Sequence, residues 1–206
     1  MLVFASANLA VFATPKTGST ALYLAFRKHA QIAMAGQPRF KHVSLSKYER
    51  HIAPMLRDGF SLTPDRAAAI REPLDYLRSW YRYRQRPDIA RAHQSAAGVS
   101  FEDFALAAIS DAPPPYAAVG RQVEFLSTSQ GVAVDHLFTQ EDELLPAFIA
   151  EKLGLETLKL GRQNVSPPAD TLLSPGAEAQ VRAAWAADCD LWQRVADAGG
   201  YLDLRT

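Results

Sequence analysis

Residues 14–20 read TPKTGST, and their setting decides how the rest of the chain is interpreted. The preceding run LAVFA at residues 9–13 is apolar and predicts a β-strand, while residues 19–29 have the apolar spacing of a helix. The short stretch is therefore a turn between a strand and the N-terminus of a helix. Such a turn presents backbone N–H groups that have no partner inside the helix, and the helix dipole adds partial positive charge there.

The residues of this turn suit a phosphate group. Lys16 supplies a full positive charge, and Gly18 allows the backbone to approach a ligand closely. Hydroxyl groups come from Thr17, Ser19 and Thr20. Together with the N–H groups, these features predict a phosphate-binding turn. The alternative is a helix-capping turn that carries a surface lysine, and the turn alone leaves both interpretations open.

The turn does not have the pattern of the ordinary nucleotide-binding loop, G-x-x-x-x-G-K-[ST]. Lys16 precedes the glycine, and no glycine lies five residues before Gly18. The next predicted strand, at residues 65–70, is followed by Arg71, where a metal-dependent nucleotide enzyme would need a carboxylate. The sequence is therefore a poor fit to an enzyme that uses ATP or GTP with magnesium.

Strands and helices alternate along the chain, which predicts an α/β domain with a mainly parallel sheet covered by helices on both faces. The run DRAAAI at 65–70 is read as a buried strand because Glu72-Pro73 stops it and starts a helix that passes Tyr83. We find no linker or repeat and expect a single domain over residues 1–206. The other expected elements are a strand at 2–5 turned at SAN, short helices within 45–56, a helix at 101–109 capped by Ser100, a strand at 134–140, a helix at 141–154 with acidic residues in its first turn, and one long helix from Ser174 to Gly199.

Composition restricts the classes of protein that are possible. Apolar residues make up 48% of the 206 residues and charged residues 21%, which is typical of a globular protein. Cys189 is the only cysteine, which excludes an internal disulfide framework and a cysteine-based zinc site and favours a reducing compartment. No apolar run approaches the ~20 residues that span a bilayer. The apolar N-terminus lacks a basic region and is read as strand, so we expect a cytoplasmic protein with no membrane span.

Charge is distributed unevenly although the formal net charge is zero. Residues 16–91 contain 15 basic and 6 acidic residues, a balance of +9, and residues 92–206 contain 7 basic and 16 acidic residues, a balance of −9. The first part therefore favours an anionic ligand. Pairing of these charges across the fold is the alternative.

A second motif makes the interpretation specific. PKTGSTAL at residues 15–22 resembles the 5′-phosphosulfate-binding loop of the sulfotransferases, and REPLDYLRSWY at 71–81 resembles their 3′-phosphate-binding motif, an arginine followed eight residues later by a serine. Arg71 and Ser79 have this spacing, and Ser79 lies two turns into the helix that begins at Pro73. The resemblance implies a three-layer fold like that of P-loop kinases, with 3′-phosphoadenosine 5′-phosphosulfate as donor substrate and no metal. It also implies that Lys16 contacts the donor phosphate and the bridging oxygen, and that Arg71 and Ser79 bind the 3′-phosphate.

Later segments resemble the bacterial and carbohydrate-type sulfotransferases with less specificity. GRQNVSPP at 161–168, followed by a long helix containing DCDLW, is similar to the closing segment of that subfamily. On this resemblance alone, Arg162 and Asn164 are expected to reach the donor.

Sulfuryl transfer also needs a base to remove the proton of the acceptor, and His42 is the candidate. It follows a short stretch after the first helix, where many relatives place a catalytic His or Glu, and imidazole titrates near neutral pH. The alternative is that His42 only packs or binds backbone; Lys41 is free to meet either donor or acceptor. No two histidines have the spacing of metal ligands.

A stretch of four arginines, Arg78, Arg82, Arg84 and Arg86, has two interpretations. It either guides an anionic donor or acceptor or forms a solvated helix face. The arginines alone give little support for nucleic acid binding.

These observations predict a sulfotransferase that moves a sulfuryl group to a hydroxyl or amine group by in-line transfer. The alternatives are a metal-dependent nucleotide phosphotransferase of kinase-like fold and a non-catalytic sulfonucleotide-binding protein. The acceptor can be a sugar, a lipid, a peptide or a small alcohol. The sequence does not indicate an oligomeric state.

Overall fold

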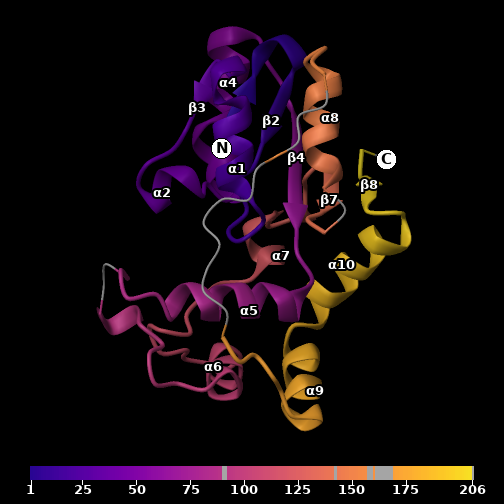
Figure 1. The fold of residues 1–206 in the computed structure, drawn as a ribbon. Helices are drawn as coiled ribbons and strands as arrows, with labels where there is room; N and C mark the ends of the chain where they lie inside the picture. Colours follow the sequence, from indigo (N-terminus) through magenta and orange to yellow (C-terminus); the bar gives the residue numbers. More distant parts are fainter. Residues whose placement is uncertain (90–91, 142, 157–159, 161–168, 206) are drawn as a thin grey trace. The chain divides into compact units, whose positions relative to one another are not determined.

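The computed structural model of the protein describes residues 1–89, 92–141, 143–156, 160 and 169–205 (Figure 1). The contacts within it group the chain into two compact units. Unit 1 comprises Met1–Arg71, Gln122–Gln163 and Trp192–Thr206, and unit 2 comprises Glu72–Arg121 and Asn164–Leu191. We expected one domain over the whole chain; each unit has a hydrophobic core of its own.

Unit 1 is built on a six-stranded sheet in the order β3-β1-β2-β4-β7-β8. Strands β2, β4 and β7 are parallel neighbours, while β1 runs antiparallel to both β2 and β3, and β8 runs antiparallel to β7. Four of the six strands, β2, β3, β4 and β7, thus point the same way, so the sheet is mixed but mostly parallel, as the alternation of elements predicted. The strands are β1 (Leu2–Phe4), β2 (Leu9–Val11), β3 (Ile32–Ala33), β4 (Asp65–Ile70), β7 (His136–Thr139) and β8 (Tyr201–Asp203).

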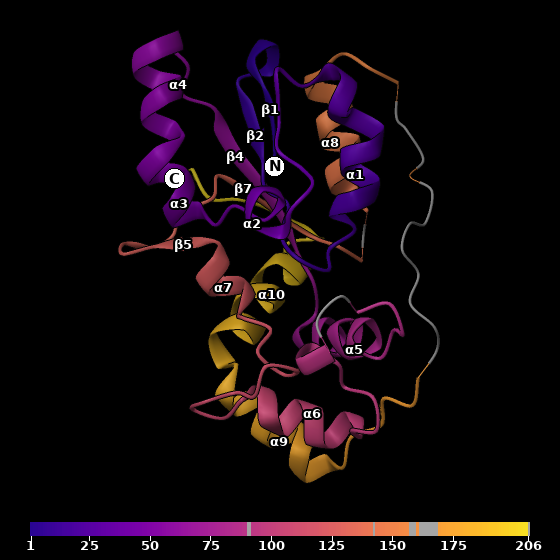
Figure 2. The same ribbon diagram turned by 90° about the vertical axis from the view of Figure 1, so that its left-hand side faces the viewer.

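Helices cover both faces of this sheet (Figure 2). Helices α1 (Ser19–Phe26) and α8 (Leu144–Lys152) lie on one face, and α3 (Leu45–His51) and α4 (Ala53–Phe60) lie on the other. The remaining short elements are η1 (Ala5–Ala7), η2 (Arg27–His29), α2 (Pro38–Lys41), η3 (Ala92–Gln94), α7 (Gln122–Phe125), β5 (Ser127–Thr128) and β6 (Gly131–Val132). Among the described residues, no helix has the length and apolar character needed to cross a membrane.

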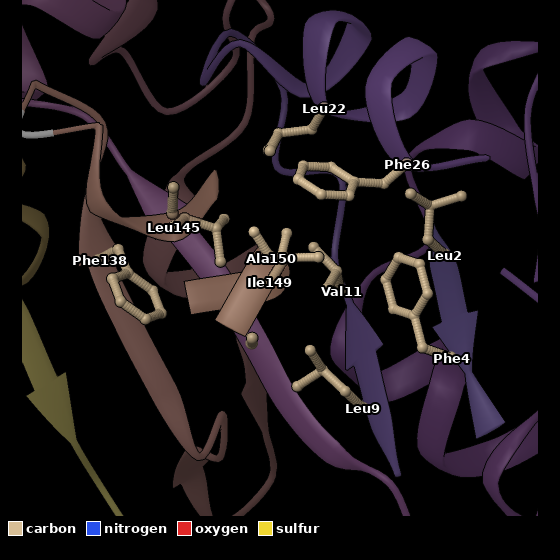
Figure 3. Close-up of a cluster of buried hydrophobic side chains, with 12 residues drawn as sticks. Leu2, Phe4, Leu9, Val11, Leu22, Phe26, Phe138, Leu145, Ile149 and Ala150 are labelled. Carbon is tan, nitrogen blue, oxygen red and sulfur yellow. The ribbon is translucent and has the colours of Figure 1, made fainter. Parts of the chain in front are cut away.

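The core of unit 1 lies between the sheet and helices α1 and α8 (Figure 3). Val11 of β2 is almost fully buried, and Phe26 of α1 and Ile149 of α8 are completely buried beside it. Strand β4 contributes Ala67 and Ala69 to the same core. Alanine favours helix in isolation, but a strand that is paired on both sides and covered on both faces follows its surroundings rather than its intrinsic propensity.

Unit 2 is helical and contains α5 (Pro73–Arg84), α6 (Phe101–Ala108) and α9 (Pro175–Ala184). The N-termini of these helices are fixed by side chains. Glu72 accepts a hydrogen bond from the Asp75 amide at 2.7 Å, and the hydroxyls of Ser100 and Ser174 accept from the amides three residues on. The caps at Ser100 and Ser174 and the proline at the start of α5 agree with the sequence prediction, whereas the cap formed by Glu72 was not predicted.

Two helix predictions were wrong in detail. The expected single helix after Ser174 is two helices, α9 and α10 (Ala186–Asp197), because Trp185 leaves helical geometry at φ −107° and ψ 29° and its indole is buried beside Tyr76. Helix α8 begins at Leu144, and Glu143 adopts a left-handed φ of 51°, so no acidic residue lies in its first turn.

Candidate functional site

The predicted phosphate-binding turn has an unusual backbone. It occupies residues 15–18 between β2 and α1, and two of its residues adopt left-handed conformations, Lys16 with φ 62° and Gly18 with φ 73°. Glycine takes this conformation easily, but for lysine it is strained by about 1–3 kcal/mol, and such strain gathers at binding sites. The hydroxyl of Thr17 donates to the carbonyl of Thr14 at 2.9 Å and holds the turn closed. Gly18 has open space where a Cβ would lie, so its conformation rather than crowding requires glycine there.

Arg71 comes to this turn from the neighbouring strand. Strands β2 and β4 are parallel, so their carboxyl ends lie at the same edge of the sheet. Arg71 follows β4, and its Nη1 donates to the carbonyl of Lys16 at 3.3 Å, across 55 residues of sequence. We call this region, the turn 14–20 with Arg71, Lys41 and His42, the carboxyl edge.

Gln122 is a residue of this region that sequence reasoning missed. Its side-chain amide is buried and bonds both backbone groups of Arg71, accepting from the N–H at 2.9 Å and donating to the carbonyl at 2.8 Å. The amide therefore fixes the backbone from which the Arg71 side chain extends. No local pattern marks Gln122, because its partner lies 51 residues away.

The contact of His42 identifies which ring nitrogen is protonated. Nδ1 of His42 lies 2.6 Å from the carbonyl oxygen of Ala13, directly before the turn. A carbonyl only accepts, so we assign the proton to Nδ1, which leaves a lone pair on Nε2 in the neutral ring. Burial lowers the pKa of His42; the bond to Ala13 opposes this, and the positive charges of Lys41, the Met1 amino group and Lys16 lower the pKa further.

Lys41 is the second cation beside the turn. Its Nζ donates to the hydroxyl of Thr20, in the first turn of α1, at 2.6 Å. Burial lowers the pKa of Lys41. A hydroxyl is a weak counterpart for a half-buried ammonium, so this part of the site favours negative charge. Lys41 also lines a small, mainly apolar pocket together with Phe12, Ala13 and Ser19.

Three predicted site residues remain, Ser79, Arg162 and Asn164. Ser79 is partly buried in α5 and belongs to unit 2, whereas Arg71 is the last residue of the first segment of unit 1. Arg162 and Asn164 lie outside the described residues.

The arrangement can bind an anion and accept a proton. The dipole and first amides of α1, together with Lys16, Lys41 and Arg71, attract negative charge, and the neutral ring of His42 has a basic nitrogen. Within the described ranges, no three His, Cys, Asp or Glu side chains gather as metal ligands would.

No protein-family model, no curated protein and no solved structure matches the chain.

Proposed function

We propose that this protein is a sulfotransferase that uses 3′-phosphoadenosine 5′-phosphosulfate and has a fold like that of the P-loop kinases. The proposal rests on the contact between Arg71 and the carbonyl of Lys16 at 3.3 Å. It joins the two motifs that resemble those of sulfotransferases, and it does so at the edge where open α/β sheets bind their ligands, beside the carboxyl ends of the strands.

In this proposal the turn binds the 5′-phosphosulfate of the donor. The amides of the α1 N-terminus and Lys16 contact the phosphate, and Arg71 binds the 3′-phosphate, to which the sequence motif also assigns Ser79. The left-handed backbone at Lys16 and Gly18 supports this role, because left-handed residues are a feature of the backbone turns whose successive amides bind anions in proteins.

Transfer is then an in-line displacement at sulfur. The oxygen of the acceptor hydroxyl forms a bond to sulfur, and the bond between sulfur and the 5′-phosphate oxygen breaks. The electron pair leaves with that oxygen, whose developing charge Lys16 stabilises, and the product is 3′-phosphoadenosine 5′-phosphate. The acceptor proton passes to Nε2 of His42. An amine acceptor reacts in the same way through nitrogen.

Calorimetry with two nucleotides tests the donor site. Arg71→Ala is expected to weaken binding of 3′-phosphoadenosine 5′-phosphate by about 2 kcal/mol, because it removes a charge-assisted bond to phosphate. Binding of adenosine 5′-phosphosulfate, which has no 3′-phosphate, is expected to change far less. Arg57→Ala is the matched control, since Arg57 is exposed and bonds only its neighbour Asp58 among the described contacts. Equal losses for both nucleotides in Arg71→Ala would contradict the assignment.

A chelator separates the proposal from a metal-dependent phosphotransferase. Sulfuryl transfer, measured with a panel of sugar, lipid, peptide and alcohol acceptors, is expected to be unchanged by EDTA, because the site supplies its positive charge through Lys16, Lys41 and Arg71. Activity that is lost with EDTA and restored by magnesium would favour the phosphotransferase. Tight nucleotide binding without turnover on any acceptor would favour a non-catalytic binding protein.

A further inference from the structure

The arginines of α5 are not equivalent in the structure. Beyond the end of the helix, Arg86 forms two hydrogen bonds with the exposed carboxylate of Asp88, at 2.9 and 2.8 Å. Arg82 is partly buried and donates to the hydroxyl of Thr171 at 3.4 Å. Arg84 is different, because only 6% of its surface is exposed. A solvated helix face therefore does not describe Arg84.

The side chains that contact Arg84 among the described residues are neutral. Its Nη1 donates to the side-chain oxygen of Gln94 at 2.7 Å, and its guanidinium lies over the ring of Trp80 at 5.3 Å. The loop after the helix folds back on it, with the amide of Ala96 donating to the Arg84 carbonyl at 3.0 Å. Its Nε is buried and has no hydrogen-bond partner within the described part of the chain.

A buried guanidinium in such surroundings is costly. A charge taken out of water needs an opposite charge or a full set of hydrogen bonds, and a single ring and one amide oxygen offset only part of the cost. Burial lowers the pKa of Arg84, with only a small opposing effect of Tyr83. The loop at residues 85–99 contains one acidic residue, Asp88, and Arg86 already binds it.

We propose that Arg84 anchors a binding site in unit 2 for an oxyanion group, which is a carboxylate, a sulfate or a phosphate. The planar guanidinium matches two oxygens of such a group, and a bound oxyanion supplies the missing negative charge. The site goes beyond the proposed function, because it uses neither the turn at 14–20 nor Arg71. The group belongs either to a free anion or to a larger ligand.

Gln94→Glu is the sharpest test, because it places a carboxylate where the amide oxygen now accepts from Arg84. In sodium chloride, the variant is expected to raise the melting temperature by about 2 °C or more, since the new pair neutralises the buried charge. His93→Glu is the matched control; it adds the same charge at an exposed position of the same loop and is expected to leave the melting temperature nearly unchanged.

The anion itself is detected at the Arg84 side chain. In protein labelled with ¹⁵N-arginine, the Nε–H resonance of Arg84 is expected to shift saturably on titration with sodium acetate, sulfate or phosphate at constant ionic strength set with chloride. Gln94→Glu is expected to abolish the shift, while Arg71→Ala keeps it, which separates this site from the proposed donor site. The anion with the highest affinity identifies the class of group.

Two outcomes would overturn the proposal. The first is an Arg84 resonance that responds to none of the three anions in the wild-type protein. The second is a Gln94→Glu variant that is no more stable than wild type, because the charge of Arg84 would then already be compensated.

Discussion

The cationic side chains at the two ends of the sheet in unit 1 have different kinds of partner. At the amino ends of β4 and β7, Arg66 binds both carboxylate oxygens of Asp135 at 2.8 and 2.9 Å and Glu49 at 2.9 Å. At the carboxyl edge, Lys41 bonds a hydroxyl and His42 bonds a carbonyl. We call the first region, residues Glu49, Asp65, Arg66, Asp135 and Arg205, the amino edge.

The pKa values shift accordingly. The hydrogen bonds that Arg66 donates to the Asp135 carboxylate raise the pKa of Arg66 above its usual value. Burial alone would raise the pKa of Asp135, but hydrogen bonds from the side chain and backbone of Arg66 outweigh it and hold this pKa below its usual value. The pKa values of Lys41 and His42 are instead lowered, first by burial. Arg66 at the amino edge is thus paired with carboxylates of the protein, whereas the ammonium of Lys41 at the carboxyl edge bonds a hydroxyl, and a bound anion would stabilise its charge.

The largest expected effect concerns the carboxyl edge. His42→Gln is expected to lower turnover by about 10²–10⁴-fold, because it removes the proposed general base, and to leave the affinity for 3′-phosphoadenosine 5′-phosphate nearly unchanged. In the wild-type protein the rate of the proposed reaction is expected to rise with pH through a midpoint below the usual 6.5 of histidine, since a base acts in its neutral form and the pKa of His42 is lowered. The variant loses this rise. If His42→Gln keeps wild-type turnover, the base is another residue. If His42→Gln loses nucleotide binding, His42 belongs to the donor site.

An intermediate effect is expected at the amino edge, on stability instead of binding. Arg66→Met is expected to lower the free energy of unfolding by about 2 kcal/mol, because it leaves the partly buried Asp135 carboxylate without its bidentate partner. Arg57→Met, which removes an exposed arginine, is the control and is expected to have little effect. Urea denaturation measures both.

The pH dependence of this stability has a definite sign. The pKa of Asp135 is lower in the folded than in the unfolded protein, where it is about 3.8. The Asp135 carboxylate therefore stabilises the fold fully above pH 3.8, and this stabilisation is lost as the pH falls toward the pKa in the folded protein. In Arg66→Met, the free energy of unfolding is expected to fall less steeply as the pH is lowered in this range. A variant as stable as wild type would show that the amino edge does not stabilise the fold through charge pairing.

The smallest effect is expected from Lys41→Met. Because the Lys41 charge contributes to the low pKa of His42, its removal is expected to raise that pKa toward the ordinary value. The titration of the His42 ring carbons by NMR measures the change. Lys47→Met, at an exposed position of α3, is the control. An unchanged or lower pKa in Lys41→Met would show that the charge of Lys41 does not contribute to the low pKa of His42.

Much of the fold could be predicted because local signals were strong. The turn before α1, the proline that starts α5 and the serine caps at Ser100 and Ser174 each act within a few residues, and each appears where expected. Strands β3 and β8 and the hairpin β5–β6 could not be predicted, since two or three residues carry no periodicity. The break at Trp185 follows from packing of its indole, which the alanine-rich sequence does not reveal.

The candidate site could be predicted in its residue types but not in its contacts. The sequence pointed to Lys16, Arg71 and His42 as separate hypotheses. It gave no sign of the Gln122 amide that holds the Arg71 backbone or of the hydrogen bond between Lys41 and Thr20. Those contacts join residues 51 and 21 positions apart, and such pairs depend on the register of the folded strands. The arginine stretch likewise needed the structure to show that Arg84 is buried.

The interleaving of the two units has a consequence for the growing chain on the ribosome. The chain passes between unit 1 and unit 2 four times, and the sheet of unit 1 receives β8, at residues 201–203, after its five other strands have been synthesised. Until then one side of β7 has no neighbouring strand, and an unpaired strand edge readily pairs with another chain. A nascent chain that stalls after residue 191 would expose this edge, so synthesis of residues 192–203 decides whether the edge is covered within the protein or open to other chains.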